Sequence, residues 1–316
     1  MDRVDIILCQ RLLANSRVSY KELARDIDLT VPAVYKRIDA LVREGIIGGF
    51  VTEVDLRVLK GLPVMVYGRS EAPLATLSIE KLSKNDAISS ILVAGGNQVY
   101  INAFLRSPGD IDGLLEFIRS QGDIPSPCLG IHMIRPEGTR LVGDVGELTA
   151  LDYRILRSLK NDSRKSSSEV AKEVGVSPRM VRSRLGRMVE SSAVRFTIRW
   201  SPDFSRDVIA LIHLSVRPDR DRGRAMGLVK ERFSDNIVFL SAFSNMPDSI
   251  LLTVWAPSMR GIGDLAESMY ATGVFRSITP NLVYSARGLE TWKDRVIEER
   301  GRLSGKRPAS SSETKP

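Results

Sequence analysis

The chain has 316 residues, of which 43% are hydrophobic and 27% are charged, and its formal net charge is +8. This composition is typical of a soluble globular protein with two domains or more, and the absence of any apolar run near the ~20 residues of a membrane helix excludes a membrane protein. The N-terminus lacks the pattern of a secretory signal, so we expect a cytoplasmic protein. Cys9 and Cys128 lie far apart among apolar neighbours, which predicts buried free thiols and argues against a disulfide framework or a metal site.

An internal repeat organises the chain. Residues 4–47 align without a gap on residues 151–194, at a shift of 147 positions, and ten positions are identical. The identities include Asp5 with Asp152, Ser16-Arg17 with Ser163-Arg164, Ser19 with Ser166, Glu22 with Glu169, Ala24 with Ala171, and Arg37 with Arg184. A repeat of this length predicts two copies of one structural unit.

Each copy begins with two predicted helices. The first has apolar residues on one face, namely Val4, Ile7, Leu8 and Leu12 in copy one and Leu151, Ile155 and Leu159 in copy two. The second opens with Ser19-x-x-Glu22 or Ser166-x-x-Glu169. In such a capping box the serine oxygen accepts from one free backbone N–H and the acid accepts from another. A short turn follows, where Asp28 or Gly175 suits a left-handed backbone.

A third helix is predicted to start at the cap Thr30 or Ser177. Its apolar stripe, spaced i, i+4, i+7, is Val34, Ile38 and Leu41 in copy one and Val181, Leu185 and Met188 in copy two. A helix, a short turn and a capped helix form a helix-turn-helix (HTH) motif. The segments "IIGGFVTEV" and "AVRFTIRW" then resemble a β-wing, so we predict winged HTH domains at residues 1–53 and 148–200.

The third helix of copy two is strongly basic. Residues 151–200 contain 12 Lys and Arg against 5 Asp and Glu, whereas residues 4–53 contain 7 of each. Arginines that point away from the apolar stripe can contact guanine and phosphate in the major groove of DNA. A solvated helix face is the alternative, but four arginines without an acid on this helix favour DNA. The predicted DNA-binding residues are Arg179, Arg182, Ser183, Arg184 (near the boundary of the stripe) and Arg187, with Tyr35, Lys36 and Arg37 in copy one.

A second repeated block follows each HTH domain and reads strand, helix, strand, strand, helix, strand. The expected strands are 62–69, 88–94, 98–105 and 128–134, then 208–217, 236–243, 249–256 and 277–284; the expected helices are 74–84 and 110–120, then 221–233 and 262–270. The order βαββαβ predicts a ferredoxin-like sheet with two helices on one face. The predicted fold class is therefore α+β, with two winged HTH domains alternating with ferredoxin-like modules at 54–138 and 201–288. Residues 139–147 form a short linker. The tail 289–316 begins with a short helix anchored by Trp292 and Val296 and continues as a polar, disordered segment.

Each half resembles the Lrp/AsnC (feast/famine) family of transcription regulators. The resemblance lies in the opening "VDIILCQRLLANSRVSYKELARDIDLT", the capped third helix, the wing and the βαββαβ module, and it covers residues 2–288 twice over. A tandem fusion of two family members is the interpretation. The resemblance implies binding to double-stranded DNA through the third helix, assembly through the sheets, and sensing of an amino acid or similar metabolite at module interfaces.

The loops where sensing is expected depart from the family pattern, which is close to Gly-x-Tyr-Asp. Copy one has Gly95, Gly96 and Asn97 without an acid, and copy two has Asn245 and Asp248 without a glycine. A glycine permits close approach of a ligand and an Asp can pair with an ammonium group. Ordinary hairpin chemistry is the alternative. These five residues are the predicted effector site.

A rival interpretation is an enzyme with vestigial HTH domains, because heme-biosynthesis (siroheme) decarboxylases resemble this family and also pair two modules. Such a site requires His and Arg converging on an acidic macrocycle. The only histidines, His132 and His213, lie inside strand patterns, where a histidine with satisfied hydrogen bonds is the simpler reading. No catalytic triad, metal-ligand spacing or phosphate loop is present. We therefore expect no enzymatic activity, no cofactor and no metal.

The predicted sheets also constrain assembly. A ferredoxin-like module has one face covered by helices, and its other face needs a partner. The second copy can supply that partner within the same chain. We therefore expect the two modules to pack sheet to sheet as an intrachain pseudo-dimer, with further homo-oligomers left open.

Overall fold

The computed structural model describes residues 1–133, 145–201 and 207–303. The helices are α1 (Arg3–Ala14), α2 (Tyr20–Asp26), α3 (Val31–Arg43), α4 (Ile79–Leu82), α5 (Ile111–Gly122), α6 (Ala150–Leu159), α7 (Ser167–Val174), α8 (Pro178–Glu190), α9 (Arg222–Phe233), α10 (Met259–Tyr270) and α11 (Trp292–Leu303). The strands are β1 (Ile47–Val54), β2 (Leu62–Arg69), β3 (Ile88–Ala94), β4 (Gln98–Leu105), β5 (Cys128–Ile131), β6 (Val194–Trp200), β7 (Val208–Val216), β8 (Ile237–Phe243), β9 (Met246–Ala256) and β10 (Phe275–Gly288). Short 3-10 turns lie at Leu56–Leu59, Ala75–Ser78, Gly95–Asn97 and Pro108–Asp110. No helix in these ranges is long and apolar enough to cross a membrane.

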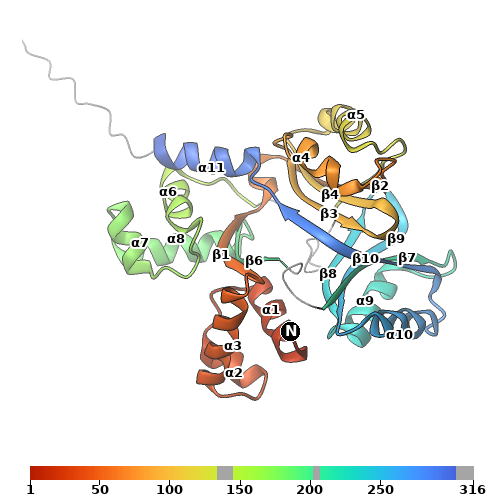
Figure 1. The fold of residues 1–316 in the computed structure, drawn as a ribbon. Helices are drawn as coiled ribbons and strands as arrows, with labels where there is room; N and C mark the ends of the chain where they lie inside the picture. The colour runs from red at the N-terminus through yellow and green to blue at the C-terminus, as the bar shows by residue number, and fades with distance from the viewer. Residues whose placement is uncertain (134–144, 202–206, 304–316) are drawn as a thin grey trace, which may run out of the picture.

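The first HTH domain (α1–α3) and the second (α6–α8) each enclose their own apolar core. The predicted stripes are buried: Val34, Ile38 and Leu41 in α3, and Val181, Leu185 and Met188 in α8. The burial follows from the i, i+4, i+7 spacing, which places these side chains on one face of the helix. Both domains lie on the same side of the molecule, joined by a two-stranded ribbon (Figure 1).

That ribbon corrects the expected wings. Neither HTH domain has a β-hairpin of its own within the described residues. Instead β1 of the first half pairs antiparallel with β6 of the second, with Val51 opposite Thr197 and Val54 opposite Val194. A single apolar strand cannot satisfy its backbone groups alone, and the equivalent strand of the other copy supplies the missing partner.

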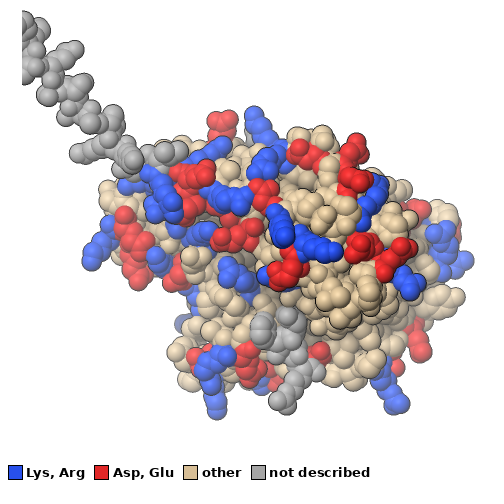
Figure 2. All heavy atoms as spheres, turned by 45° about the horizontal axis from the view of Figure 1, so that its top comes forward, with Lys and Arg blue, Asp and Glu red and all other residues tan. Residues whose placement is uncertain are grey.

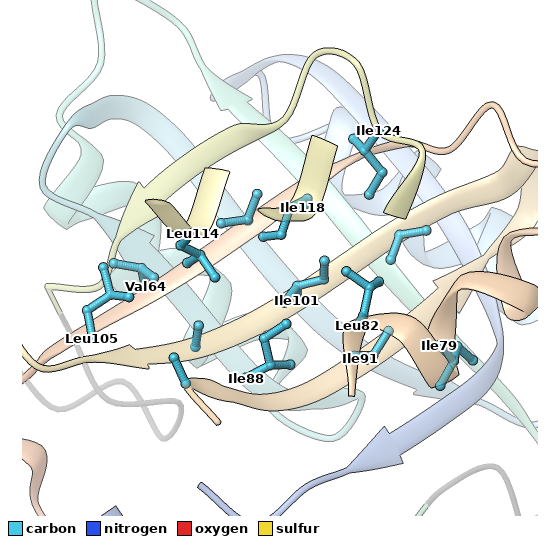
Figure 3. Packing of buried hydrophobic residues seen from close by; sticks show 14 of the residues in the cluster. Val64, Ile79, Leu82, Ile88, Ile91, Ile101, Leu105, Leu114, Ile118 and Ile124 are labelled. Carbon is cyan, nitrogen blue, oxygen red and sulfur yellow. The ribbon is translucent and has the colours of Figure 1, made fainter. Parts of the chain in front are cut away.

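The first module (β2–β5 with α4 and α5) and the second (β7–β10 with α9 and α10) have the same strand order. The sheet runs β5-β2-β4-β3-β10-β7-β9-β8, so each half places its fourth strand beside its first and its third beside its second, the ferredoxin-like order. Helices cover one face of each module, and in the first module Leu114 and Ile118 of α5 pack on Ile101 and Ile91 of the sheet (Figure 3). The helix expected at 74–84 is shorter, because a 3-10 turn at Ala75–Ser78 precedes the single turn of α4.

The two modules join edge to edge as well as face to face. β3 pairs antiparallel with β10, and at the other end of the sheet His132 and Phe243 form a bridge between the end of β5 and β8. The sheet therefore curls until its ends meet, as in a barrel. Its inner face holds a shared apolar cluster from both modules, built from Met65, Ala94, Tyr100, Leu211, Phe243 and Leu251. The two modules pair within one chain, as expected, and their sheet edges are also hydrogen-bonded to each other.

The two HTH domains dock on different parts of the molecule. In the first HTH domain, Ile6 packs with Trp255 of the second module, and the Gln10 amide donates to the carbonyl of Ser234 at 2.8 Å and to that of Ile237 at 2.7 Å. The second HTH domain instead contacts α11, whose Ile297 enters the core of that domain. The two dockings therefore use different surfaces.

Helix α11 belongs to the tail and connects two parts of the molecule. Trp292 is buried in the first module and its Nε1 donates to the carbonyl of Phe104 at 2.6 Å. Six residues later, Glu298 pairs with Arg157 of α6 at 2.8 Å. Trp292 is the predicted anchor, whereas Ile297, not Val296, is the deeper second one. The expected disordered end and most of the expected linker lie outside the described residues, and Cys128 is only half-buried whereas Cys9 is buried.

Candidate nucleic-acid interface

Local sequence signals fix where the helices of each HTH motif begin. The second helix of each motif, α3 or α8, is called its recognition helix. The Ser19 Oγ accepts from the N–H of Glu22 at 3.1 Å, and the Ser166 Oγ accepts from that of Glu169 at 3.2 Å, so both predicted capping boxes are present. Thr30 caps α3 and Ser177 caps α8 as predicted, and the turns before them contain Asp28 at φ 53° and Gly175 at φ 73°. These predictions are confirmed because capping and turn chemistry act over a few residues.

Helix α8 exposes part of its predicted DNA-binding set. Arg179, Arg182 and Ser183 are exposed, and within the described residues none of the three side chains has a hydrogen bond or ion pair. They lie in the first two turns of a helix whose opposite face is buried. Their donors are therefore free for an external partner.

The other two arginines of α8 are bound inside the domain. Arg187 donates to Oδ2 of Asp152 at 2.8 Å, and Arg184 lies 3.6 Å from the same atom. The carboxyl group of Asp152 is fully buried at the start of α6, where it also accepts from the backbone N–H of Thr149 at 2.8 Å. Arg184 and Arg187 therefore share a partner on α6, which lies 32 and 35 residues earlier in the chain and not on α8, and contact of these two arginines with DNA stays a prediction.

Copy one repeats this arrangement. Arg37 donates to Asp2 at 2.7 Å and to Asp5 at 2.8 Å, and these hydrogen bonds, chiefly the one to Asp5, raise the pKa of its guanidinium. Arg37 is thus held by two acids of the first HTH domain, and its contact with DNA stays a prediction. The other two predicted contact residues of α3 are exposed: Lys36 has no partner among the described residues, and Tyr35 is 58% exposed.

The internal repeat contained a signal for these ion pairs. Asp5 aligns with Asp152 and Arg37 with Arg184, and all four are identities of the repeat. The structure shows that the aligned acid and the aligned arginine are partners in both copies. An acid and an arginine that are both identical between the two copies therefore indicated an ion pair inside each domain.

A second pair of identities joins the two HTH domains. The hydroxyls of Ser16 and Ser163 lie 2.7 Å apart and are fully buried. Arg17 donates to the carbonyl of Lys165 at 2.9 Å, and Arg164 donates to the carbonyl of Ser16 at 2.7 Å. Reciprocal contacts of this kind define a two-fold relation. The two recognition helices are therefore held in a pseudo-symmetric arrangement.

The arginines of this contact are packed on aromatic rings. The Arg164 guanidinium lies 4.4 Å from the ring centre of Phe50 and 4.7 Å from that of Tyr20. Arg17 lies 4.9 Å from the ring of Phe196, and burial lowers the pKa of its guanidinium. Stacked, hydrogen-bonded arginines restrict rotation of one domain against the other.

Net charge alone does not locate a nucleic-acid face. On the face drawn in Figure 2, basic and acidic side chains are interspersed and no continuous basic surface is present. Charged side chains of the surface also neutralise one another in ion pairs, for example Arg106 with Asp86 at 3.1 Å. The unpaired arginines of α8 are therefore more informative than the total of +8.

The predicted effector residues do not form one site. Gly95 and Gly96 are exposed, and Asn97 holds the segment before α4, its amide donating to the carbonyl of Ala72 at 2.9 Å. Across the molecule, Asn245 binds the edge of β5 through Oδ1, which accepts from the N–H of Ile131 at 2.9 Å. Asp248 is exposed, and no hydrogen bond among the described residues links the two loops. Effector binding at these residues stays a prediction.

Two surface grooves are present elsewhere. One, of about 330 Å³, is lined by Glu71, Ala72, Pro73, Arg119, Asp123 and Pro125. The other, of about 450 Å³, lies between α10 and β10 and is lined by Ala266, Glu267, Tyr270, Ala271, Ser277 and Ile278. None of the predicted effector residues lines either groove.

The inner face of the curled sheet contains a polar cluster that spans both modules. The Tyr100 hydroxyl lies 2.7 Å from Nε2 of His213 and accepts from the Asn281 amide at 2.9 Å. The ring of Tyr67 stacks on that of Tyr100, with centroids 5.9 Å apart. Burial lowers the pKa of His213 and raises that of Tyr100. His213 is thus a hydrogen-bonded sheet histidine, as expected, whereas His132 packs on Phe243 and burial lowers its pKa to about 4.

Comparison with known proteins agrees with this architecture. The profile of the AsnC-type helix-turn-helix domain matches residues 148–189, and that of a winged helix-turn-helix DNA-binding domain matches residues 1–47. An uncharacterised HTH-type transcriptional regulator of Pyrococcus furiosus is 31% identical over 111 residues, which cover 35% of this chain and 75% of the relative.

The chain belongs to the Lrp/AsnC family. The regulator LysM of Saccharolobus solfataricus is 28% identical over 126 residues, covering 36% of this chain and 88% of LysM. Each such relative thus matches little more than a third of this Lrp/AsnC chain. That proportion agrees with a chain that contains two HTH domains and two modules.

One solved structure matches almost the whole chain and corrects an expectation. The siroheme decarboxylase NirDL superposes with a TM-score of 0.60 at 11% identity, covering 96% of this chain and 99% of NirDL. NirDL in complex with an iron-uroporphyrin III analogue gives a TM-score of 0.58. The expectation that the chain is not an enzyme is therefore wrong as it stood, because an enzyme has this same Lrp/AsnC-type fold and HTH domains do not exclude catalysis.

Proposed function

We propose that the chain is a fused pair of Lrp/AsnC units that regulates transcription by binding specific DNA sequences through α3 and α8. The observation that carries the proposal is the pair of arginines, Arg179 and Arg182, that start a recognition helix and have no partner among the described residues. Such side chains enter the major groove, where guanidinium groups bind guanine and phosphate.

The proposal also rests on the contact between the two HTH domains. The reciprocal hydrogen bonds of Arg17 and Arg164 hold both recognition helices in one arrangement. In an HTH dimer such an arrangement matches two half-sites on one duplex. Here one chain supplies both readers.

We propose further that α8 provides most of the attraction to DNA. Counting only partners in the described part of the chain, its exposed first turns contain two free arginines, whereas those of α3 contain one free lysine, Lys36. Asp39 on α3 is paired with Arg43 at 2.9 Å, so that pair adds little net charge. The operator should accordingly have unequal arms.

The experiment is binding of fluorescent DNA across a series of salt concentrations, using genomic fragments that the purified protein retains and that are then sequenced. Arg179→Ala with Arg182→Ala should weaken binding at least tenfold, since each base-reading arginine contributes about 1 to 3 kcal/mol. Lys36→Ala should lower the salt slope by about 1 and weaken binding less. Arg260→Ala, an exposed arginine of α10, is the control that should change nothing.

Variants of Arg184, Arg187 and Arg37 are unsuitable for this purpose, because each would also break an internal ion pair. Retention of no fragment by the wild type would exclude the proposed function. Equal losses from Arg179→Ala with Arg182→Ala and from Arg260→Ala would show that α8 is not the principal reader.

We infer a second candidate, an enzyme of the siroheme decarboxylase class, from the fold that spans the whole chain and from the His213–Tyr100 cluster on the inner face. It ranks second because no arginine is hydrogen-bonded to that cluster among the described residues, and an acidic macrocycle requires cations. Visible absorption after addition of iron-uroporphyrin III, with mass spectrometry of the product, tests it. An unchanged spectrum and an unchanged mass would remove this candidate.

A further inference from the structure

We infer that the two recognition helices read chemically different bases at equivalent positions: α8 requires guanine opposite Arg182, and α3 requires the methyl group of thymine opposite Tyr35. The inference rests on the proposed function and names the base classes that each reader selects. It follows from the alignment of the two helices, their exposure and the contact that relates them.

The two positions are equivalent in structure. Tyr35 and Arg182 differ by the repeat shift of 147, and each is the fifth residue of a helix of 13 residues. Both helices bury the residue just before it, Val34 or Val181. Because reciprocal contacts at Ser16 and Ser163 relate the domains, the two side chains face equivalent places on a duplex.

Helix α8 presents hydrogen-bond donors at this position. The guanidinium of Arg182 has no acceptor within the described residues, and Arg179 lies one turn earlier on the exposed side. Arginine donates two parallel hydrogen bonds to the O6 and N7 atoms of guanine, and adenine lacks this pair of acceptors. The arm that α8 contacts should therefore contain guanine.

Helix α3 presents apolar surface at the same position. Tyr35 is 58% exposed and Val31, one turn earlier, is 42% exposed. The ring of Tyr35 is positioned by an edge contact with Tyr20, with centroids 5.8 Å apart and planes at 88°. A fixed apolar surface in the major groove favours the C5 methyl group, which thymine alone presents there.

The test separates the methyl group from the rest of the base. Duplexes enriched from a random pool by the wild type are resynthesised with uracil in place of single thymines, which removes only the methyl group. One replacement in the α3 arm should weaken binding about fourfold, the effect of one buried methyl group. The same replacement in the α8 arm, the matched control, should have no effect. Replacing the guanine in the α8 arm by adenine should weaken binding about 5- to 150-fold.

Exchange variants complete the experiment. Tyr35→Arg should enrich duplexes with guanine in both arms, and Arg182→Tyr should lose the guanine preference and gain sensitivity to uracil in both arms. Both residues are exposed, so Arg182→Tyr should leave the melting temperature unchanged and Tyr35→Arg should lower it only slightly, through loss of the contact with Tyr20; melting is measured alongside. Failure to enrich any duplex would overturn the proposed function together with this inference. Enrichment of identical arms, or binding indifferent to uracil in the α3 arm, would overturn the inference alone.

Discussion

The first and second HTH domains are built alike inside and differ outside. Inside, each has a capped recognition helix and an arginine paired with an acid of its first helix, Arg37 with Asp5 and Arg184 with Asp152. Outside, the fifth residue of the recognition helix is Tyr35 in one and Arg182 in the other. A shared interior maintains one fold and one orientation, so the exposed residues are free to differ.

The two domains also dock differently. In the first, Ile6 packs directly against the second module through Trp255. In the second, the aligned residue Tyr153 accepts at its hydroxyl from Arg300 of α11 at 2.7 Å. The second HTH domain therefore depends on a helix that has no counterpart within the described part of the first half. Four predictions can break or sharpen this comparison.

The largest effect is expected from Ile297→Asp. Ile297 is buried between α11 and the second HTH domain, and burying an unpaired charge there should cost about 4 kcal/mol of folding free energy. Hydrogen exchange should accelerate in α6 and stay unchanged in α1. Glu299→Ala, an exposed change on the same helix, serves as the control. Equal acceleration in α1 and α6 would contradict separate docking.

Acid should weaken the contact between the two modules at the bridge of His132 and Phe243. Burial lowers the pKa of His132 to about 4, so the unfolded chain, with a histidine pKa of about 6.5, binds more protons between these values. Stability present above pH 6.5 is therefore lost as the pH falls towards 4, by about 3 kcal/mol.

Urea unfolding at pH 7 and pH 4.5 measures this loss. His132→Gln should lose less stability on acidification than the wild type, since it removes the buried titrating ring. His213→Gln should act in the same direction, because burial also lowers the pKa of His213. If His132→Gln and the wild type lose the same stability on acidification, protonation of His132 does not weaken the contact between the modules.

Removal of the internal acid should affect the second HTH domain more than the first. Asp152 is fully buried and contacts two arginines, whereas Asp5 is 16% exposed and contacts one. Asp152→Ala should lower the free energy of unfolding by about 2 kcal/mol and Asp5→Ala by about 1 kcal/mol. The difference is expected because a charged hydrogen bond contributes more where it is more deeply buried. Urea midpoints of both variants, beside exposed Glu190→Ala, give the comparison. A larger loss in Asp5→Ala would reverse the inferred ranking.

The smallest difference is expected at the contact between the domains. Arg164 binds two carbonyls and two aromatic rings, whereas Arg17 binds one of each and has a buried Nη1 without a partner. Arg164→Ala should therefore cost about 2 kcal/mol and Arg17→Ala about 1 kcal/mol or less. Thermal melting of the two variants distinguishes them, and identical losses would mean that the pseudo-symmetric contact is energetically symmetric.

Local features could be predicted because their physics is local. Ser19 and Glu22 are three residues apart, so their capping box depends only on the chain between them. The spacing of Val181, Leu185 and Met188 likewise identified the buried face of α8. The same reasoning placed Arg187 outside the core, and its exposed fraction of 55% agrees, but its partner Asp152 lies on another helix.

The sequence by itself determined the repeat, the helix starts, the strand order within each module and the excess of charge in the second HTH domain, because periodicity, capping and composition can be read along the chain. Only the tertiary structure decided which arginines are free, that the single strands β1 and β6 pair with each other, and that the sheet closes through β3–β10 and His132–Phe243. These contacts join residues far apart in sequence, as the buried hydroxyls of Ser16 and Ser163 do across 147 positions. Burial and ion pairing depend on which parts of the chain come together in the folded protein. Contacts between distant parts of the chain produce no periodic pattern in the sequence.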